Sequence, residues 1–232
     1  MDELLNLIKN IWPGKSSKPQ PKVKKNVVKI VFASNNRHKV NEINAIARAF
    51  SAESALAANI EFVLPSGSFN PAENGATFIE NARIKALAAA RAEKSTRFFF
   101  LADDSGLCVR ALNGEPGLKS ARYAATNEES IAKVLKNLEG ADNRKAQFVC
   151  AMVLCDKTGK VLRAITDVCD GEIAASPQGE GGFGYDPIFT PDGYPCTLAQ
   201  LNEKEKNKIS HRGKALRNVL EWIQANPLQK PD

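Results

Sequence analysis

The most constraining feature of the sequence is an apolar run that leads directly into two carboxylates, RFFFLADD at residues 97–104. Five successive apolar residues predict a strand buried on both faces, as in the interior of a parallel sheet. Charged groups are costly to bury unless they meet solvent, a cation or hydrogen-bond donors. We therefore expect the strand to end at Asp103 and Asp104 and to deliver both carboxylates to a functional site at the edge of a sheet.

The two aspartates are expected to have different roles, because neighbouring side chains on an extended chain point to opposite sides. One carboxylate would face a cleft, where it can hold Mg²⁺ or deprotonate a water molecule, and the other would accept backbone hydrogen bonds. Magnesium takes oxygen ligands and keeps several waters, which suits one or two carboxylates together with substrate phosphates. Glu73 is a candidate second carboxylate. The alternative is a polar turn between strands, with Glu73 simply solvated.

The rest of the chain alternates strands and helices. Apolar runs at 27–33 and 60–64 predict two further strands. Segments 147–156 and 160–170 flank a Lys-Thr-Gly turn and predict an antiparallel hairpin. Helices are expected at about 40–50, 77–94, 126–138 and 210–224, the second and third opened by Thr-x-x-Glu capping boxes. This order predicts an α/β fold with a mixed sheet.

The net charge of +6 is unevenly distributed. Residues 1–26 carry +4 of it and are interpreted as a basic N-terminal extension, a short amphipathic helix followed by a Lys/Pro-rich linker. The remainder carries only +2 and lacks RNP, KH and helix-turn-helix patterns, so no stable nucleic-acid partner is expected. No apolar stretch approaches the roughly 18 residues of a transmembrane segment. Five cysteines without a CxxC pair are interpreted as buried, reduced thiols, which fits a cytoplasmic location.

Three further segments combine polar, charged and glycine residues. The first is the strand-to-helix turn SNNRHK at 34–39. Backbone N–H groups at the start of a helix, asparagine side chains and Lys39 can cradle a polyphosphate. The alternative is that Asn and Ser in this turn only cap the helix.

The second segment is the glycine-rich loop at 179–187. Its glycines allow the backbone to approach a ligand closely, and its two aromatic residues offer faces on which a planar base can stack. The alternative is a mobile loop whose aromatic side chains plug the core.

The third segment, 205–213, leads into the last helix. Lys206 is placed to reach a phosphate, and His211 with Arg212 to donate hydrogen bonds to a keto oxygen on a base. The alternative is that Ser210 caps the helix and the basic residues form a solvated face.

Six blocks occur in order along the chain: SNNRHKVNE, TFIENARIKA, LADDSGLCVRALNGEPG, SARYA, GGFGYDPIF and KNKISHRGKAL. Together they resemble the inosine/xanthosine triphosphate pyrophosphatase family, over about residues 28–224. The resemblance implies a two-lobed α/β fold, with a long central mixed β-sheet flanked by helices, a cleft between the lobes and a homodimer. It implies a catalytic domain at 27–226, between the extension at 1–26 and a C-terminal tail at 227–232.

The activity that the resemblance implies is Mg²⁺-dependent hydrolysis of ITP, dITP and XTP to the monophosphate and pyrophosphate. This reaction removes noncanonical purine nucleotides before they enter DNA or RNA. A related pyrophosphatase acting on a different modified nucleotide is the alternative within the enzymes, and a nucleic-acid-binding module is the alternative outside them.

Roles for individual residues also follow from the resemblance. Asp104 corresponds to the general base and a magnesium ligand, and Glu73 to a residue that assists at the metal. The substrate-binding positions are Ser34, Asn35, Asn36, Arg37, His38, Lys39, Ser105, Phe183, Gly184, Tyr185, Asp186, Lys206, His211 and Arg212. Lys119 and Gln200 stand where the family usually has an aromatic residue and Glu, which bears on local packing or dimer contacts.

Overall fold

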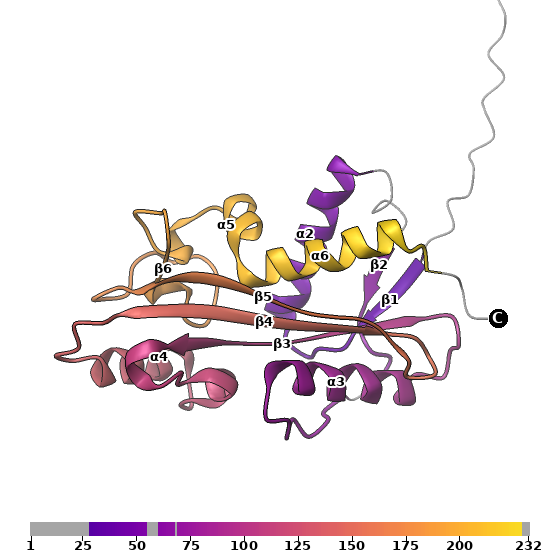
Figure 1. The fold of residues 1–232 in the computed structure, drawn as a ribbon, viewed down its shortest axis with the longest axis horizontal. Helices are drawn as coiled ribbons and strands as arrows, with labels where there is room; N and C mark the ends of the chain where they lie inside the picture. The colour runs from indigo at the N-terminus through magenta and orange to yellow at the C-terminus, as the bar shows by residue number, and fades with distance from the viewer. Residues whose placement is uncertain (1–27, 55–59, 68, 229–232) are drawn as a thin grey trace, which may run out of the picture.

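A six-stranded mixed sheet, in the order β2-β1-β3-β4-β5-β6, forms the centre of the computed structural model (Figure 1). The structure describes residues 28–54, 60–67 and 69–228. The strands are β1 (Val28–Phe32), β2 (Ile60–Val63), β3 (Phe99–Val109), β4 (Lys145–Cys155), β5 (Val161–Ile173) and β6 (Phe189–Pro191). β1 pairs in parallel with β2 and β3, and the other neighbours are antiparallel. The mixed sheet and the hairpin are therefore confirmed, whereas the expected extension at 1–26 lies outside the described residues.

Five α-helices of the described residues flank this sheet, with α2, α5 and α6 on one face and α3 and α4 on the other (Figure 1). They are α2 (Arg37–Glu53), α3 (Phe78–Ala92), α4 (Asn127–Asn137), α5 (Glu203–Ile209) and α6 (His211–Ala225). The capping boxes of α3 and α4 form as expected. α2 begins three residues earlier than predicted, because Asn36 caps it, and the short α5 was not predicted. No helix of the described part is long and apolar enough to cross a membrane.

Three hydrophobic clusters of the described residues pack against the long strands β3, β4 and β5, and one of them lies between the sheet and α3. At one end the sheet packs beneath α2 and α6, with Leu101 and Met152 fully buried among their side chains. At the other end Leu107 and Phe189 belong to a second cluster that includes side chains of α4. These two lobes share one sheet, as the two-lobed expectation requires, and polar side chains collect where the clusters meet.

β3 does not end at the two aspartates, which corrects the expectation drawn from the sequence. It continues to Val109 because it pairs in antiparallel register with β4 along its whole length, placing Asp103 opposite Met152 and Asp104 opposite Ala151. The polar turn considered as an alternative is also wrong. Charged groups are tolerated in mid-strand here because each carboxylate meets cationic side chains, as described below.

The cysteine interpretation is partly confirmed. All five cysteines are free thiols. Cys150, Cys155 and Cys169 are buried in the sheet, and Cys108 and Cys196 are only half-buried.

Candidate active site

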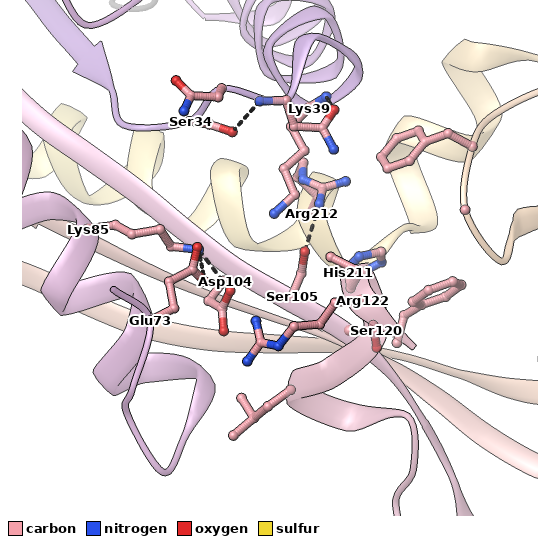
Figure 2. A pocket seen from close by; sticks show the side chains of 18 of the residues that line it. Ser34, Lys39, Glu73, Lys85, Asp104, Ser105, Ser120, Arg122, His211 and Arg212 are labelled. Carbon is pink, nitrogen blue, oxygen red and sulfur yellow. Dashed lines mark hydrogen bonds and ion pairs between the residues drawn. The ribbon is translucent and has the colours of Figure 1, made fainter. Parts of the chain in front are cut away.

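A cavity of about 380 Å³ lies where the two lobes meet, above the middle of β3 (Figure 2). Its lining brings together residues from all four segments singled out in the sequence. The predicted residues that line it are Ser34, Asn35, Asn36, Lys39, Glu73, Asp104, Ser105, Phe183, Gly184, Tyr185, Asp186, Lys206, His211 and Arg212. Arg37 and His38 are exposed and do not line it.

The carboxylates of Glu73 and Asp104 share one ammonium group, that of Lys85 on α3. Lys85 Nζ donates to Asp104 Oδ1 at 2.8 Å and to Glu73 Oε2 at 2.9 Å (Figure 2). Asn81 Nδ2 donates to the other Asp104 oxygen at 3.2 Å. Two side chains, Lys85 and Asn81, thus fix the carboxylate of Asp104, the predicted general base, in one orientation.

Burial raises the pKa of Asp104 above its ordinary value, and the negative charge of Glu73 adds to this effect against the opposing charge of Lys85. Burial by itself also raises the pKa of Glu73, but the hydrogen bond and charge of Lys85 outweigh it, and that pKa is lowered. Of the two neighbouring carboxyl groups, Asp104 is therefore the better proton acceptor.

Lys85 and Asn81 are site residues that sequence reasoning missed. They lie four residues apart on α3, on the same helix face as the buried Ala82, Ala86 and Ala89. Two polar side chains on a face otherwise made of alanines are a detectable signal, because a buried ammonium group requires anionic partners.

Asp103 points to the opposite face of the sheet and is bound by two cations, which corrects the expectation that it accepts backbone hydrogen bonds. Lys39 Nζ donates to Asp103 Oδ1 at 3.1 Å, and Arg212 donates through Nε and Nη2 to Oδ2 at 3.2 and 3.1 Å. Burial would raise the pKa of Asp103, but the charges of Lys39 and Arg212 outweigh it and hold the pKa far below its ordinary value.

A buried chain of alternating charges continues from Asp103 toward the glycine-rich loop. Glu42 on α2, a residue that sequence reasoning missed, accepts from Arg212 Nη1 and pairs with Lys206 Nζ at 2.6 Å. Lys206 Nζ also donates to Asp186 Oδ2 at 2.7 Å. Asp186 in turn accepts from the backbone N–H of Phe183 at 2.8 Å. Lys39 is thereby connected through a chain of ion pairs and hydrogen bonds to the glycine-rich loop.

The Phe183 ring lines the cavity and is held among polar groups. His38 stacks on it, with 5.4 Å between ring centroids, and Lys206 Nζ lies 5.0 Å from its centroid. Gly182 permits this placement because its φ is +71° and a Cβ atom there would lie 2.1 Å from Asp186 Oδ2. Tyr185 is instead buried in a hydrophobic cluster, so the core-plugging alternative holds for Tyr185 and not for Phe183.

His211 is buried and neutral. Burial lowers its pKa well below the ordinary value, and the charge of Arg212 adds to that effect. The imidazole stacks on Phe148 at 4.7 Å with an interplanar angle of 8°, and its Nδ1 has no hydrogen-bond partner in the described part of the chain. Ser210 does cap α6, as the alternative proposed, but Arg212 beside it is buried and not part of a solvated face.

The strand-to-helix turn is tightly hydrogen-bonded. Asn36 Oδ1 accepts from the backbone N–H groups of His38 and Lys39 at 3.0 and 3.3 Å, and Ser34 Oγ accepts from the N–H of Asn36 at 3.1 Å. Asn35 Nδ2 donates to the carbonyl of Phe69. Asn36 therefore caps α2, as the alternative proposed, but it also lines the cavity together with Ser34 and Lys39.

Ser120, Arg122 and Asn127 also line the cavity, and sequence reasoning gave them no role although Ser120 and Arg122 belong to SARYA, one of the matching blocks. Ser120 and Arg122 lie on η3, the 3₁₀ helix Gly117–Arg122. Across the described residues, no group of three or more His, Cys, Asp or Glu side chains is placed to hold a metal ion.

Comparison with known proteins agrees with this fold. A model of the Ham1 family matches residues 30–222. The chain is 41% identical over 206 residues to a protein named dITP/XTP pyrophosphatase from Methylacidiphilum infernorum, which covers 87% of this chain and 96% of the relative. A Ham1 protein from Coxiella burnetii superposes with a TM-score of 0.72 at 40% identity, covering 86% of this chain and all of that one. A Mycobacterium abscessus structure described as a nucleoside-triphosphatase and dITP/XTP pyrophosphatase gives a TM-score of 0.63 at 35% identity, over 84% of this chain and all of that one. With its fold and most of its length matched, the chain belongs to the Ham1 family.

Proposed function

We propose that this protein hydrolyses ITP, dITP and XTP to the nucleoside monophosphate and pyrophosphate. The observation that carries the proposal is that one cavity is lined both by the carboxylates of Glu73 and Asp104 and by the aromatic ring of Phe183. A triphosphate fits beside the carboxylates and a purine base against the ring. Relatives named dITP/XTP pyrophosphatase support two of these substrates, dITP and XTP.

Asp104 is the proposed general base. Its carboxylate is oriented by Lys85 and Asn81, and its raised pKa makes it a better proton acceptor than an exposed aspartate. In the proposed reaction Asp104 takes a proton from a water molecule as the water oxygen attacks the α-phosphorus. The bond from the α-phosphorus to the bridging oxygen breaks, and pyrophosphate leaves. Lys39, at the start of α2, stabilises the negative charge of the leaving group.

The donor set at the two carboxylates fits a divalent cation, which we propose to be Mg²⁺. Glu73 and Asp104 supply the hard oxygen ligands that Mg²⁺ prefers, and one or two carboxylates suffice when substrate phosphates and waters complete the shell. When bound, the cation would neutralise the negative charge on the phosphoryl group during transfer.

The charge balance of the cavity also favours binding of a divalent cation together with the substrate. Five cationic side chains line it, and five carboxylates lie on or directly behind its wall, so the described site carries no net formal charge to offset a polyanionic triphosphate. The cations are Lys39, Lys85, Arg122, Lys206 and Arg212, and the carboxylates are Glu42, Glu73, Asp103, Asp104 and Asp186.

Base selectivity is proposed to come from hydrogen-bond donors that line the same cavity as Phe183. The base stacks on Phe183, and the neutral His211 with Arg212 directs N–H groups toward the 6-keto oxygen. Adenine carries an amino group at this position and leaves such donors unpaired. A site built around a hydrogen bond that the competitor cannot make rejects the competitor by orders of magnitude. We further propose that the protein acts as a homodimer in the cytoplasm.

Pyrophosphate release from ITP, XTP, dITP, ATP and GTP, each with Mg²⁺ and with a chelator, tests the function. We expect Mg²⁺-dependent hydrolysis of the first three and at least about 100-fold lower kcat/KM with ATP. Equal rates with ATP and ITP would contradict the selectivity, and absence of hydrolysis of every nucleotide would contradict the activity. Sedimentation of the purified protein measures the dimer.

A further inference from the structure

Four of the five cationic side chains that line the cavity are held by carboxylates. Lys39 and Arg212 pair with Asp103, Lys85 pairs with Asp104, and Lys206 pairs with Asp186, all at 3.1 Å or less. The fifth cation is Arg122, which is exposed and whose side chain makes no hydrogen bond or ion pair with any described residue. Arg122 is thus the cationic group of this wall that can bind an anion without giving up a carboxylate.

The guanidinium of Arg122 extends into the cavity on the side where Glu73 and Asp104 lie (Figure 2). It enters from η3, whereas Lys85 approaches the same carboxylates from α3 on the other side. An anion bound in front of Asp104 would therefore lie between these two cations.

The segment that carries Arg122 is held firmly by its neighbour Ser120. Ser120 Oγ accepts from the backbone N–H of Leu107 at 2.9 Å and donates to the carbonyl of Gly117 at 2.6 Å. The Ser120 carbonyl accepts from the Tyr185 hydroxyl at 2.9 Å. η3 is therefore fixed both to β3, three residues beyond Asp104, and to the glycine-rich loop.

Gly106 on β3 makes this attachment possible. A Cβ atom at Gly106 would lie 2.3 Å from the Gly117 carbonyl oxygen and 2.5 Å from Ser120 Oγ, so only glycine lets η3 approach this closely. The backbone of Arg122 is thus held in a defined position, while its guanidinium has no partner among the described residues. A fixed backbone with an unpaired guanidinium indicates a role in ligand binding and not in stabilising the fold.

We propose that Arg122 binds the triphosphate chain of the substrate beside Asp104 in the cavity, an inference that rests on the proposed function. A guanidinium presents a planar fork of donors that matches two phosphate oxygens at once, which an ammonium group does not. Charge-assisted hydrogen bonds of this kind are the stronger ones in proteins. Binding at Arg122 also requires no existing ion pair to break, unlike binding at Lys39 or Lys85.

The test compares Arg122→Gln and Arg122→Lys with the wild type and with Arg110→Gln as a matched control. Arg110 is also exposed and also lies on a short 3₁₀ helix, but it does not line the cavity. We expect kcat/KM for ITP to fall about 10- to 100-fold in Arg122→Gln, the loss typical of a charge-assisted hydrogen bond. Arg122→Lys is expected to recover part of the loss, and Arg110→Gln to match the wild type.

Two inhibitors separate phosphate binding from a structural effect. The inhibition constant of pyrophosphate is expected to rise about 10-fold in Arg122→Gln, while that of inosine, which has no phosphate, stays unchanged. An equal rise for both inhibitors, or no change in kcat/KM, would overturn the proposal.

Calorimetric binding of inorganic tripolyphosphate distinguishes this proposal from the proposed function, because it needs no turnover. Weaker binding to Arg122→Gln than to the wild type supports the role of Arg122 even if no nucleotide is hydrolysed. Equal binding to both proteins overturns that role even if the wild type hydrolyses ITP.

Discussion

Asp103 and Asp104 are consecutive residues of β3 whose carboxylates serve opposite faces of the sheet. Asp103 is bound by Lys39 of α2 and Arg212 of α6 on one face, and Asp104 by Asn81 and Lys85 of α3 on the other. The alternation of side chains along a strand produces this separation directly. Asp103 thereby links α2 and α6 through its ion pairs, and Asp104 faces the cavity.

Exchange of each aspartate for asparagine should separate these roles. Asp104→Asn is expected to lose nearly all turnover and to stay folded, because Lys85 keeps Glu73 as a partner. Asp103→Asn leaves Arg212 and Lys39 without their shared carboxylate, and loss of one partner of a buried ion pair costs about 3–5 kcal/mol. Urea unfolding and ITP hydrolysis of both variants provide the measurements. An Asp104→Asn protein that retains most of its activity would remove Asp104 from the role of general base.

Glu42 is expected to stabilise the fold through the charge network. Glu42→Gln weakens the bonds to Arg212 and Lys206, each of which keeps one other carboxylate, so we expect a loss of about 1–3 kcal/mol of unfolding free energy. The matched control on the same helix is Glu53→Gln. The pair of Glu53 with Arg217 is largely exposed at 3.4 Å, so its loss should cost about 0–1 kcal/mol. Equal losses in the two variants would show that the network does not contribute in this way.

Local sequence patterns were sufficient to predict those elements whose ends are determined by interactions between neighbouring residues. The Thr77 and Thr126 capping boxes start α3 and α4 because the interacting groups lie within three residues of each other. The continuation of β3 past Asp104 could not be predicted in that way. It depends on pairing with β4, which begins at Lys145, and on cations supplied by distant helices.

The same distinction holds for the candidate site. Side chains in polar, glycine-rich segments were found because their composition is unusual for the ends of strands and helices. Lys85 and Glu42 were missed because each lies on a helix face that is mainly apolar, and their charged partners come from other segments. Arg122 was missed because it is exposed, and only the folded arrangement shows that it faces the cavity.

Phe183 is expected to contribute to binding of the base and not of the phosphates. Base–aromatic stacking contributes about 1–3 kcal/mol in nucleic-acid complexes, so Phe183→Ala should raise KM for ITP by about 10- to 100-fold. Phe183→Tyr, which keeps the ring, should remain close to the wild type. The inhibition constant of pyrophosphate, measured in the same assay, should not change. A pyrophosphate constant that rises with KM would mean that the loop itself has moved.

His211 is expected to make the fold less stable in mild acid. Burial holds its folded-state pKa well below the ordinary 6.5. The contribution of the neutral imidazole to the folding free energy is therefore fully present above pH 6.5. As the pH falls below 6.5, the unfolded chain takes up a proton that the folded protein does not, and this part of the stability is lost toward the lower folded-state pKa. Between pH 7.5 and 5.5 the wild type should lose about 1–1.5 kcal/mol more than His211→Gln. Urea unfolding at both pH values measures the difference, and equal losses would contradict a buried, neutral imidazole.

Gly106 should be intolerant of even one added methyl group. In Gly106→Ala the new Cβ would lie within 2.5 Å of both the Gly117 carbonyl oxygen and Ser120 Oγ, so η3 must move away from β3. Overpacking of this kind typically costs about 1–3 kcal/mol. Movement of η3 also displaces Arg122, so kcat/KM for ITP should fall together with the melting temperature. The control is Gly67→Ala, where a Cβ atom meets nothing within 4 Å and the unfolding free energy should change by less than about 0.5 kcal/mol. A Gly106→Ala protein with wild-type stability and activity would show that η3 does not need its close attachment to β3.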